Sequence, residues 1–231
     1  MAYDDEQHGI AQRYLIQALR MARAASDHAL AAEILAAMSH QATYIGRSGE
    51  AVDLARAAQI GARKAGLAVL ESECHIVEAH GHAARRDALA CARSLSAAET
   101  TFGRSAPTPP GWLRYFDQAY LSAKFGHCFR DLDDPRRSGE YAEQSLRMSD
   151  GYQRGRAFNL CLLAAARSAE DPLEAARLGD QALTIAGGLA SRRSLSYLRD
   201  LRHRLTRHAR IPEVAHFRNR IALAAAVTAR G

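Results

Sequence analysis

The chain has 231 residues, of which 48% are hydrophobic and 24% are charged, and its formal net charge at pH 7 is +6. This length and apolar content allow a sizeable buried core, which excludes extensive disorder. The sequence has no apolar run of the ~20 residues that a membrane span needs, no secretory signal pattern and no C-x-x-C pair, so we expect a protein of the reducing cytoplasm.

Helix-forming residues fill the chain, and Gly and Pro punctuate it, whereas alternating runs of Val, Ile and Thr are absent. The expected helices, in chain order, span residues 4–25, 27–46, 48–65, 67–83, 86–102, 112–132, 135–149, 152–169, 172–188, 191–208 and 212–229. The one long connection, SAPTPPG at 105–111, is interpreted as a spacer or as a lid. The sequence therefore predicts an all-α fold of about 11 helices.

Large and small residues recur in the order that a tetratricopeptide (TPR) unit requires. In LAAMSHQATYIGRSGEAVDLARAA (35–58) the small Ser39 lies twelve residues before Ala51, and in the stretch 122–146 Gly126 lies twelve before Ser138. We therefore expect a TPR-like right-handed superhelix of antiparallel helix pairs. It would form a single domain over 1–231, with repeat halves at 4–25, 27–65, 67–102, 112–149, 152–188 and 191–229.

The stretch FGHCFRDL at 125–132 combines residue types that occur in active sites and metal sites. On the repeat pattern, Gly126 must be small where two helices cross, and Cys128 is an inert packing residue. His127 and Arg130 are three residues apart on one helical face, and we expect that face to line the concave groove of the array.

The stretch ECHIVEAHGH at 73–82 could be read as a metal site. A zinc-binding helix needs two histidines four residues apart, and His75, His80 and His82 do not have that spacing. The alternative is that these are polar residues facing solvent or the groove. We expect no metal, no cofactor and no catalytic residue, because no G-x-S-x-G, Walker A or G-x-G-x-x-G motif follows a strand.

The groove remains as the candidate site, with aromatic, imidazole and guanidinium side chains suited to stacking and to holding a carboxylate or a peptide terminus. Its expected lining residues are His40, Thr43, Tyr44, His80, Tyr120, His127, Arg130, Arg156, Asn159 and Arg167. A hydrated groove without a dedicated ligand is the alternative.

Positive charge is concentrated at the C-terminal end of the chain. Residues 192–231 contain ten arginines against Asp200 and Glu213, a local balance of +8, so that the first 191 residues carry about −2 by difference. Such a segment can contact nucleic acid or an acidic partner. It can also be a solvated helical face.

Several stretches, among them AQRYLIQALRMA, MSHQATYIGRSGEAVDLARAA and WLRYFDQAYLSAKFGHCFRDL, resemble the C-terminal TPR-like region of bacterial helix-turn-helix (XRE-type) transcriptional regulators from antibiotic-producing bacteria. The resemblance covers nearly the whole chain. It implies a region that senses a ligand or partner and that dimerises, while DNA is read by a helix-turn-helix domain that this sequence lacks. The chain opens on what reads as the second helix of a repeat, as expected of a fragment of a regulator or of a stand-alone repeat protein.

We therefore expect a non-catalytic module that binds a peptide or small signal in its groove, contacts a protein partner and forms a homodimer. A stand-alone TPR scaffold for a regulatory or biosynthetic complex is the alternative function. One of the two ends of the array would be the dimer surface. At the first end lies the apolar stripe of the first helix, with Ile10, Ala11, Tyr14, Leu15, Ala18 and Leu19, and at the other end the IALAAAV helix at 221–227 has a similar apolar surface.

Overall fold

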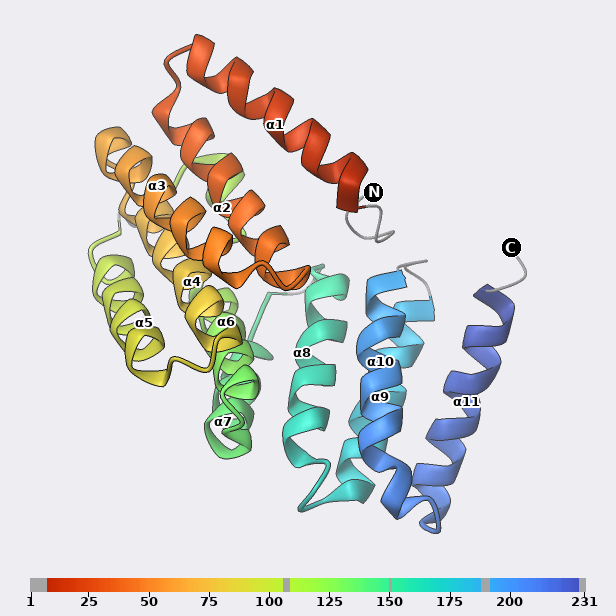
Figure 1. Cartoon of the computed structure of the whole chain (residues 1–231). Coiled ribbons are helices and arrows are strands. Elements are labelled where there is room, and N and C mark those ends of the chain that lie inside the picture. Colours follow the sequence, from red (N-terminus) through yellow and green to blue (C-terminus); the bar gives the residue numbers. More distant parts are fainter. Residues whose placement is uncertain (1–7, 106–108, 150, 188–191, 229–231) are drawn as a thin grey trace. The chain divides into compact units, whose positions relative to one another are not determined.

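The structure is a computed structural model that describes residues 8–105, 109–149, 151–187 and 192–228. These residues form eleven α-helices and two short 3-10 helices, with no strand among them (Figure 1). The helices are α1 (His8–Ala24), α2 (His28–Tyr44), α3 (Ser48–Ala65), α4 (Ala68–Ala84), α5 (Ala88–Phe102), η1 (Gly111–Leu113), α6 (Gln118–Asp131), α7 (Pro135–Ser145), α8 (Gln153–Arg167), α9 (Pro172–Gly187), α10 (Arg192–Arg204), η2 (Leu205–His208) and α11 (Pro212–Thr228). No helix in the described ranges is both long and apolar enough to cross a membrane.

The predicted all-α class and the number of helices are confirmed, and most helix ends fall close to their predicted positions. One prediction, a single helix over 112–132, is wrong at its beginning. Residues 111–113 form a 3-10 helix instead, and α6 begins only at Gln118, where Asp117 caps it. The predicted helical residues 4–7, 188, 191 and 229 and part of the predicted lid or spacer, 106–108, lie outside the described residues.

Aspartate side chains fix where five helices begin. Asp27, Asp87, Asp117, Asp134 and Asp171 each accept a hydrogen bond from the backbone N–H three residues later, at 2.8–3.0 Å. This contact satisfies one of the N–H groups that have no partner within the helix, and it is worth about 1 kcal/mol. The caps set the register of the helical faces described below.

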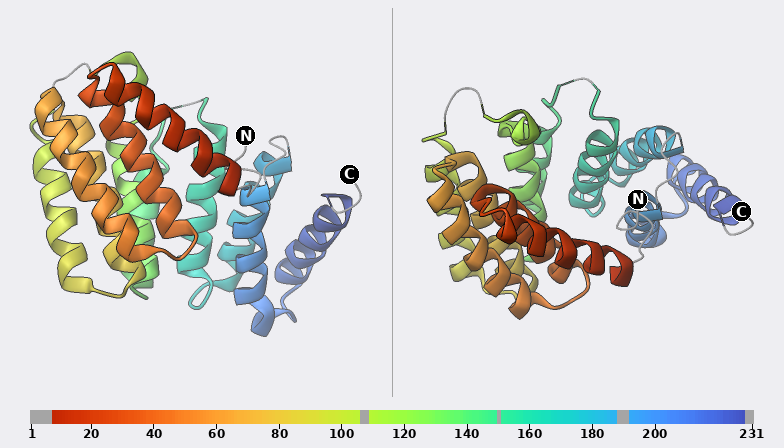
Figure 2. Two further views of the ribbon diagram at one scale, coloured as in Figure 1. Left: turned by 45° about the horizontal axis from the view of Figure 1, so that its top comes forward. Right: turned by 90° about the horizontal axis from the view of Figure 1, so that it is seen from above.

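Two compact units make up the described chain, residues 8–133 and residues 134–228. Their boundary lies inside the repeat that the sequence predicts over 112–149. In the N-terminal unit, α2, α4 and α6 lie side by side in one layer, α3 packs against α2 and α4, and α5 packs against α4 (Figure 2). Helix α4 is the centre of this unit, with thirteen of its 17 residues buried.

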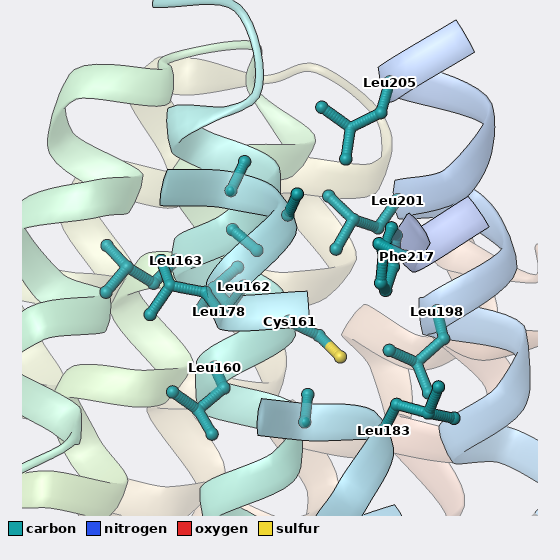
Figure 3. Close-up of a cluster of buried hydrophobic side chains, with 14 of the residues drawn as sticks. Leu160, Cys161, Leu162, Leu163, Leu178, Leu183, Leu198, Leu201, Leu205 and Phe217 are labelled. Carbon is teal, nitrogen blue, oxygen red and sulfur yellow. The ribbon is translucent and has the colours of Figure 1, made fainter. Parts of the chain in front are cut away.

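The C-terminal unit has a leucine-rich core between α8, α9, α10 and α11 (Figure 3). Leu198, Leu201 and Leu205 follow one another on one face of α10 and η2, and all three are at most 1% exposed. Phe217 of α11 is fully buried against them. Gly179 of α9 lies beneath this cluster, where an added Cβ would come within 2.8 Å of Phe217 and Leu201.

We predict that Gly179→Ala lowers the free energy of unfolding by roughly 1–3 kcal/mol, because the new methyl group overlaps packed side chains. Gly139→Ala is the matched control, since its Cβ would meet Ala166 at an ordinary 3.5 Å. This control should be neutral or slightly stabilising, because alanine favours the helix. Urea denaturation of both variants checks the prediction, and equal stabilities would contradict the packing described here.

Candidate functional site

Three neighbouring helices of the N-terminal unit place the same kinds of side chain in the same register. Glu33 and His40 on α2, Glu73 and His80 on α4, and Tyr120 and His127 on α6 are each seven residues apart. Seven residues make about two helical turns, so each pair lies on one face of its helix. Because α2, α4 and α6 are adjacent, the six side chains form two rows, one of Glu33, Glu73 and Tyr120 and one of His40, His80 and His127. We call this surface the polar face.

The first row is built around two carboxyl groups and two phenols. The hydroxyl of Tyr115, in the turn between η1 and α6, lies 2.7 Å from Glu73 Oε2 and 3.1 Å from Glu33 Oε1. The Tyr120 hydroxyl lies 3.5 Å from the other oxygen of Glu73. Tyr115 thus ties the connection before α6 to both α2 and α4.

The two glutamates hold a proton more tightly than ordinary carboxylic acids. Burial and the neighbouring charge of Glu33 together raise the pKa of Glu73 to about 8, against the opposing effects of Tyr115 and Lys124. Burial also raises the pKa of Glu33. Glu33 Oε2 is buried and accepts no hydrogen bond from the described residues. Two buried carboxylates at close range do not both ionise. A single proton shared by Glu33 and Glu73 would give this oxygen a hydrogen-bond partner.

A lysine balances the remaining charge. The Lys124 ammonium group lies 5.1 Å from the centre of the Tyr120 ring, and Lys124 is only 9% exposed. Its positive charge lowers the pKa of both Glu33 and Glu73. With one proton on the glutamate pair, the charges of Glu33, Glu73 and Lys124 sum to about zero.

The second row is a line of three imidazoles. The ring centroids of His40 and His80 are 6.0 Å apart and those of His80 and His127 are 6.2 Å apart, both edge to face. His80 Nε2 lies 3.1 Å from the Lys124 carbonyl oxygen. Since a carbonyl only accepts, Nε2 of His80 carries the proton in this contact, and Nδ1 is the unprotonated nitrogen when the ring is neutral.

A second buried carboxylate of α4, Glu78, has a different environment. Arg56 Nε and Gln59 Nε2, both from α3, donate to its two oxygens at 2.8 and 2.7 Å, and His82 Nε2 lies 3.6 Å from it. Burial alone would raise the pKa of Glu78, but the hydrogen bonds from His75, Arg56 and Gln59 lower it to about 2. Glu78 is therefore ionised and joins α3 to α4.

The structure brings four of the sequence-predicted groove residues together on the polar face, namely His40, His80, Tyr120 and His127. Three others of the same unit have different surroundings. Thr43 donates to the Ser39 carbonyl of its own helix at 3.2 Å, and the Tyr44 ring lies 5.3 Å from His8 of α1. Arg130 donates twice to Asp131, at 2.7 and 2.9 Å.

The remaining three predicted residues belong to the C-terminal unit and contact their own neighbours there. Arg156 donates to the Met148 carbonyl at 3.4 Å, and the buried Asn159 donates to the Ser145 carbonyl at 3.3 Å. Arg167 forms an ion pair with Glu143. Whether any of the ten residues contacts a ligand stays a prediction.

Four residues of the site were not among those predicted from the sequence: Glu33, Glu73, Tyr115 and Lys124. The seven-residue spacing that relates Glu33 to His40 and Glu73 to His80 is visible in the sequence and could have identified the two glutamates. The stretch 73–82 was expected to face solvent or the groove, yet Glu78 and His82 are 8% and 7% exposed and pack inside the unit.

Among the residues that the structure describes, no three His, Cys, Asp or Glu side chains converge closely enough to hold a metal ion. All four cysteines are buried. Burial raises the pKa of Cys74 and Cys128 well above the ordinary thiol value and that of Cys161 to about 12, so these three thiols stay protonated at neutral pH and are poor nucleophiles and metal ligands.

No protein-family model matches the chain, and no curated protein shows significant similarity to it. The function of the polar face is therefore inferred from its geometry and chemistry.

We predict that Glu73→Gln makes the stability of the protein less dependent on pH. The pKa of Glu73 is about 8 in the folded protein against an ordinary value of 4.5, so the folded state binds more protons than the unfolded state between these values. The contribution of Glu73 to stability is fully present below pH 4.5 and is lost as the pH rises through 8.

Between pH 5 and pH 8.5 the unfolding free energy of the wild type should therefore fall relative to that of Glu73→Gln, by on the order of a few kcal/mol. Urea denaturation across this range measures the difference. Glu99→Gln, at an exposed position of α5, is the control. A Glu73→Gln profile parallel to that of the wild type would contradict the assignment.

Proposed function

We propose that the protein is a non-catalytic, ligand-sensing and protein-interaction module, and that it binds a small polar signal or the end of a peptide on the polar face of α2, α4 and α6. The observation that supports this most directly is the repeated register of Glu33 with His40, Glu73 with His80 and Tyr120 with His127. A packing role alone does not require a polar residue followed seven residues later by a histidine on three neighbouring helices.

The energetic cost of the polar face supports a role in binding. Burying a carboxyl group without full hydrogen bonding costs stability, and an apolar side chain at the same place would be neutral or favourable. Glu73 is 7% exposed, and Glu33 retains an oxygen without a partner in the described chain. Such groups are concentrated at functional sites, where stability is given up for chemistry.

The arrangement favours a ligand with hydrogen-bond donors, such as an amine or a hydroxylated compound. The first row offers carboxyl oxygens at Glu33 and Glu73, next to the hydroxyl groups of Tyr115 and Tyr120. Arg130, the arginine that the sequence predicts for this part of the groove, pairs with Asp131 and so is occupied by another carboxylate. The three imidazoles can donate or accept, and they extend the site along the helices.

A sensing role is favoured over catalysis by the state of the reactive groups. The raised pKa values of the buried Cys74, Cys128 and Cys161 thiols keep them protonated. Burial and the charge of Glu73 also raise the pKa of the Tyr115 phenol, so it acts as a hydrogen-bond donor and not as a base. The groups of the polar face are suited to recognition.

The resemblance of the sequence to the TPR-like region of helix-turn-helix regulators supports the further proposal that this module controls a DNA-binding domain in the same or an associated chain. Ligand binding across α2, α4 and α6 would bias the arrangement of these helices and so the partner domain. A stand-alone scaffold remains the second candidate, and the exposed apolar side chains of α1 favour it, since Tyr14 and Met21 are 67% and 74% exposed.

We predict that a ligand of the polar face raises the melting temperature of the wild-type protein but raises that of Glu73→Gln and His127→Ala far less. Differential scanning fluorimetry with a panel of amines, hydroxylated compounds and short peptides is the measurement. At a concentration of about 100 times the dissociation constant, a ligand stabilises its site by roughly 2.7 kcal/mol.

Two exposed residues of the same unit provide matched controls, Glu99→Gln on α5 and His28→Ala at the beginning of α2. Both controls should respond to the ligand as the wild type does. A ligand that stabilises all four variants equally would place its binding site elsewhere on the protein.

We also propose that a second copy of the chain covers the exposed side of α1. Of the stripe that the sequence predicts for dimerisation, Ile10 and Tyr14 are exposed, Ala11 is buried, and Leu15, Ala18 and Leu19 are half-buried. Ile16 and Met21 add to the exposed apolar surface. Closed two-fold contacts are the commonest way for a chain to cover such a surface.

The predicted mass in solution is about twice the 25.2 kDa of one chain, and Tyr14→Glu should reduce it to that of a monomer. Light scattering coupled to size exclusion measures it. Leu89→Glu changes a residue of similar exposure (69%) on α5, and it should leave the dimer intact. A wild-type monomer would contradict self-association and favour a different protein partner on α1.

A further inference from the structure

The end of α10 and the following 3-10 helix η2 present a basic surface. Between residues 199 and 210 the exposed side chains include Arg199, Arg202, Arg204, Arg207 and Arg210. His203 is exposed between them, and the arginines recur about once per helical turn. We call these residues the basic face.

Four of these arginines have no acidic partner among the residues that the structure describes. Asp200, the only acidic residue of the segment, pairs with Arg204 at 2.7 Å. Within the part of the chain that the structure describes, Arg199, Arg202, Arg207 and Arg210 form no ion pair with a carboxylate. The basic face therefore keeps an uncompensated charge of four guanidinium groups.

The backbone under the basic face is held in place from α11. Arg218 Nη1 donates to the Arg202 carbonyl in the last turn of α10 and to Thr206 Oγ1 in η2, both at 2.7 Å. Leu201 and Leu205, on the opposite side of the same segment, are buried in the core. The arginines are thus presented from a fixed support.

A structural role accounts for only part of this charge. Basic side chains in the last turn of a helix interact favourably with its dipole, and Arg202 and Arg204 of α10 are in that position. The effect fades within one turn, so it does not explain Arg199 before that turn or Arg210 beyond η2.

We infer that the basic face binds the phosphate backbone of double-stranded DNA. A protein partner is disfavoured because protein interfaces have an apolar centre, and no large apolar side chain between 199 and 210 is exposed. Single-stranded nucleic acid is disfavoured because its recognition relies on stacking of bases on large aromatic rings, and residues 199–210 contain no Phe, Tyr or Trp. A duplex backbone requires only cations and hydrogen-bond donors, and arginine supplies both.

This contact is independent of the polar face, and it differs from the expectation that DNA is reached only through a helix-turn-helix domain. Phosphate contacts position a protein on DNA without reading its sequence. The basic face would therefore hold the C-terminal unit on DNA of any sequence, as an accessory to a domain that selects the site.

Fluorescence anisotropy with a labelled random-sequence duplex of about 20 base pairs and the 231-residue protein tests the inference. Four phosphate contacts predict a slope of log K against log salt of about −3 to −4, or roughly 100-fold weaker binding between about 50 and 200 mM salt. The variant R199Q/R202Q/R207Q/R210Q should lose most of this slope and at least about tenfold in affinity at low salt.

The control variant R136Q/R147Q/R154Q/R177Q removes the same charge from other exposed positions of the C-terminal unit, and it should bind within about twofold of the wild type. Melting temperatures verify that both variants are folded. Three results would each overturn the inference: no binding at low salt, equal losses in the two variants, or competition by polyglutamate as effective as by unlabelled duplex at equal charge concentration.

Discussion

Two carboxyl groups that meet inside the N-terminal unit constrain the rest of its polar face. Glu33 and Glu73 come from neighbouring helices, and their oxygens converge on the single hydroxyl of Tyr115. The Tyr115 hydroxyl has only one proton to donate, and the Tyr120 hydroxyl lies as far as 3.5 Å from Glu73. The pair must therefore retain a proton or acquire a further donor. The positions of α2, α4 and the turn before α6 all depend on how this requirement is met.

The seven-residue spacing on α2, α4 and α6 explains how the three histidines reach the same surface. A step of seven residues from each member of the first row leads to a histidine, so the imidazoles of His40, His80 and His127 line up without any further device. The centre of the unit is stabilised elsewhere, where Arg56 and Gln59 hold Glu78 ionised at the contact between α3 and α4. The contact with α3 and the proposed binding face thus lie on opposite sides of α4.

Local signals in the sequence predicted the helices well, because Gly, Pro and the periodic small residues act over a few positions. Asp117 was the signal missed at α6, since its capping role depends on the turn that precedes it. For the site, the repeat register predicted His40, His80, Tyr120 and His127. It did not predict that Tyr115 meets Glu33, 82 positions earlier in the chain, because that contact depends on how an irregular connection folds back.

The protonation state of Glu73 is the most direct test of this account. Carbon-13 NMR of protein labelled at the glutamate carboxyl groups follows each titration separately. The account predicts one resonance, absent from Glu73→Gln, whose midpoint lies near pH 8 and falls when Glu33 is replaced by glutamine. If every glutamate carboxyl instead titrates near the ordinary value of about 4.3, the two groups do not form a buried pair, and the proposed binding face loses its basis.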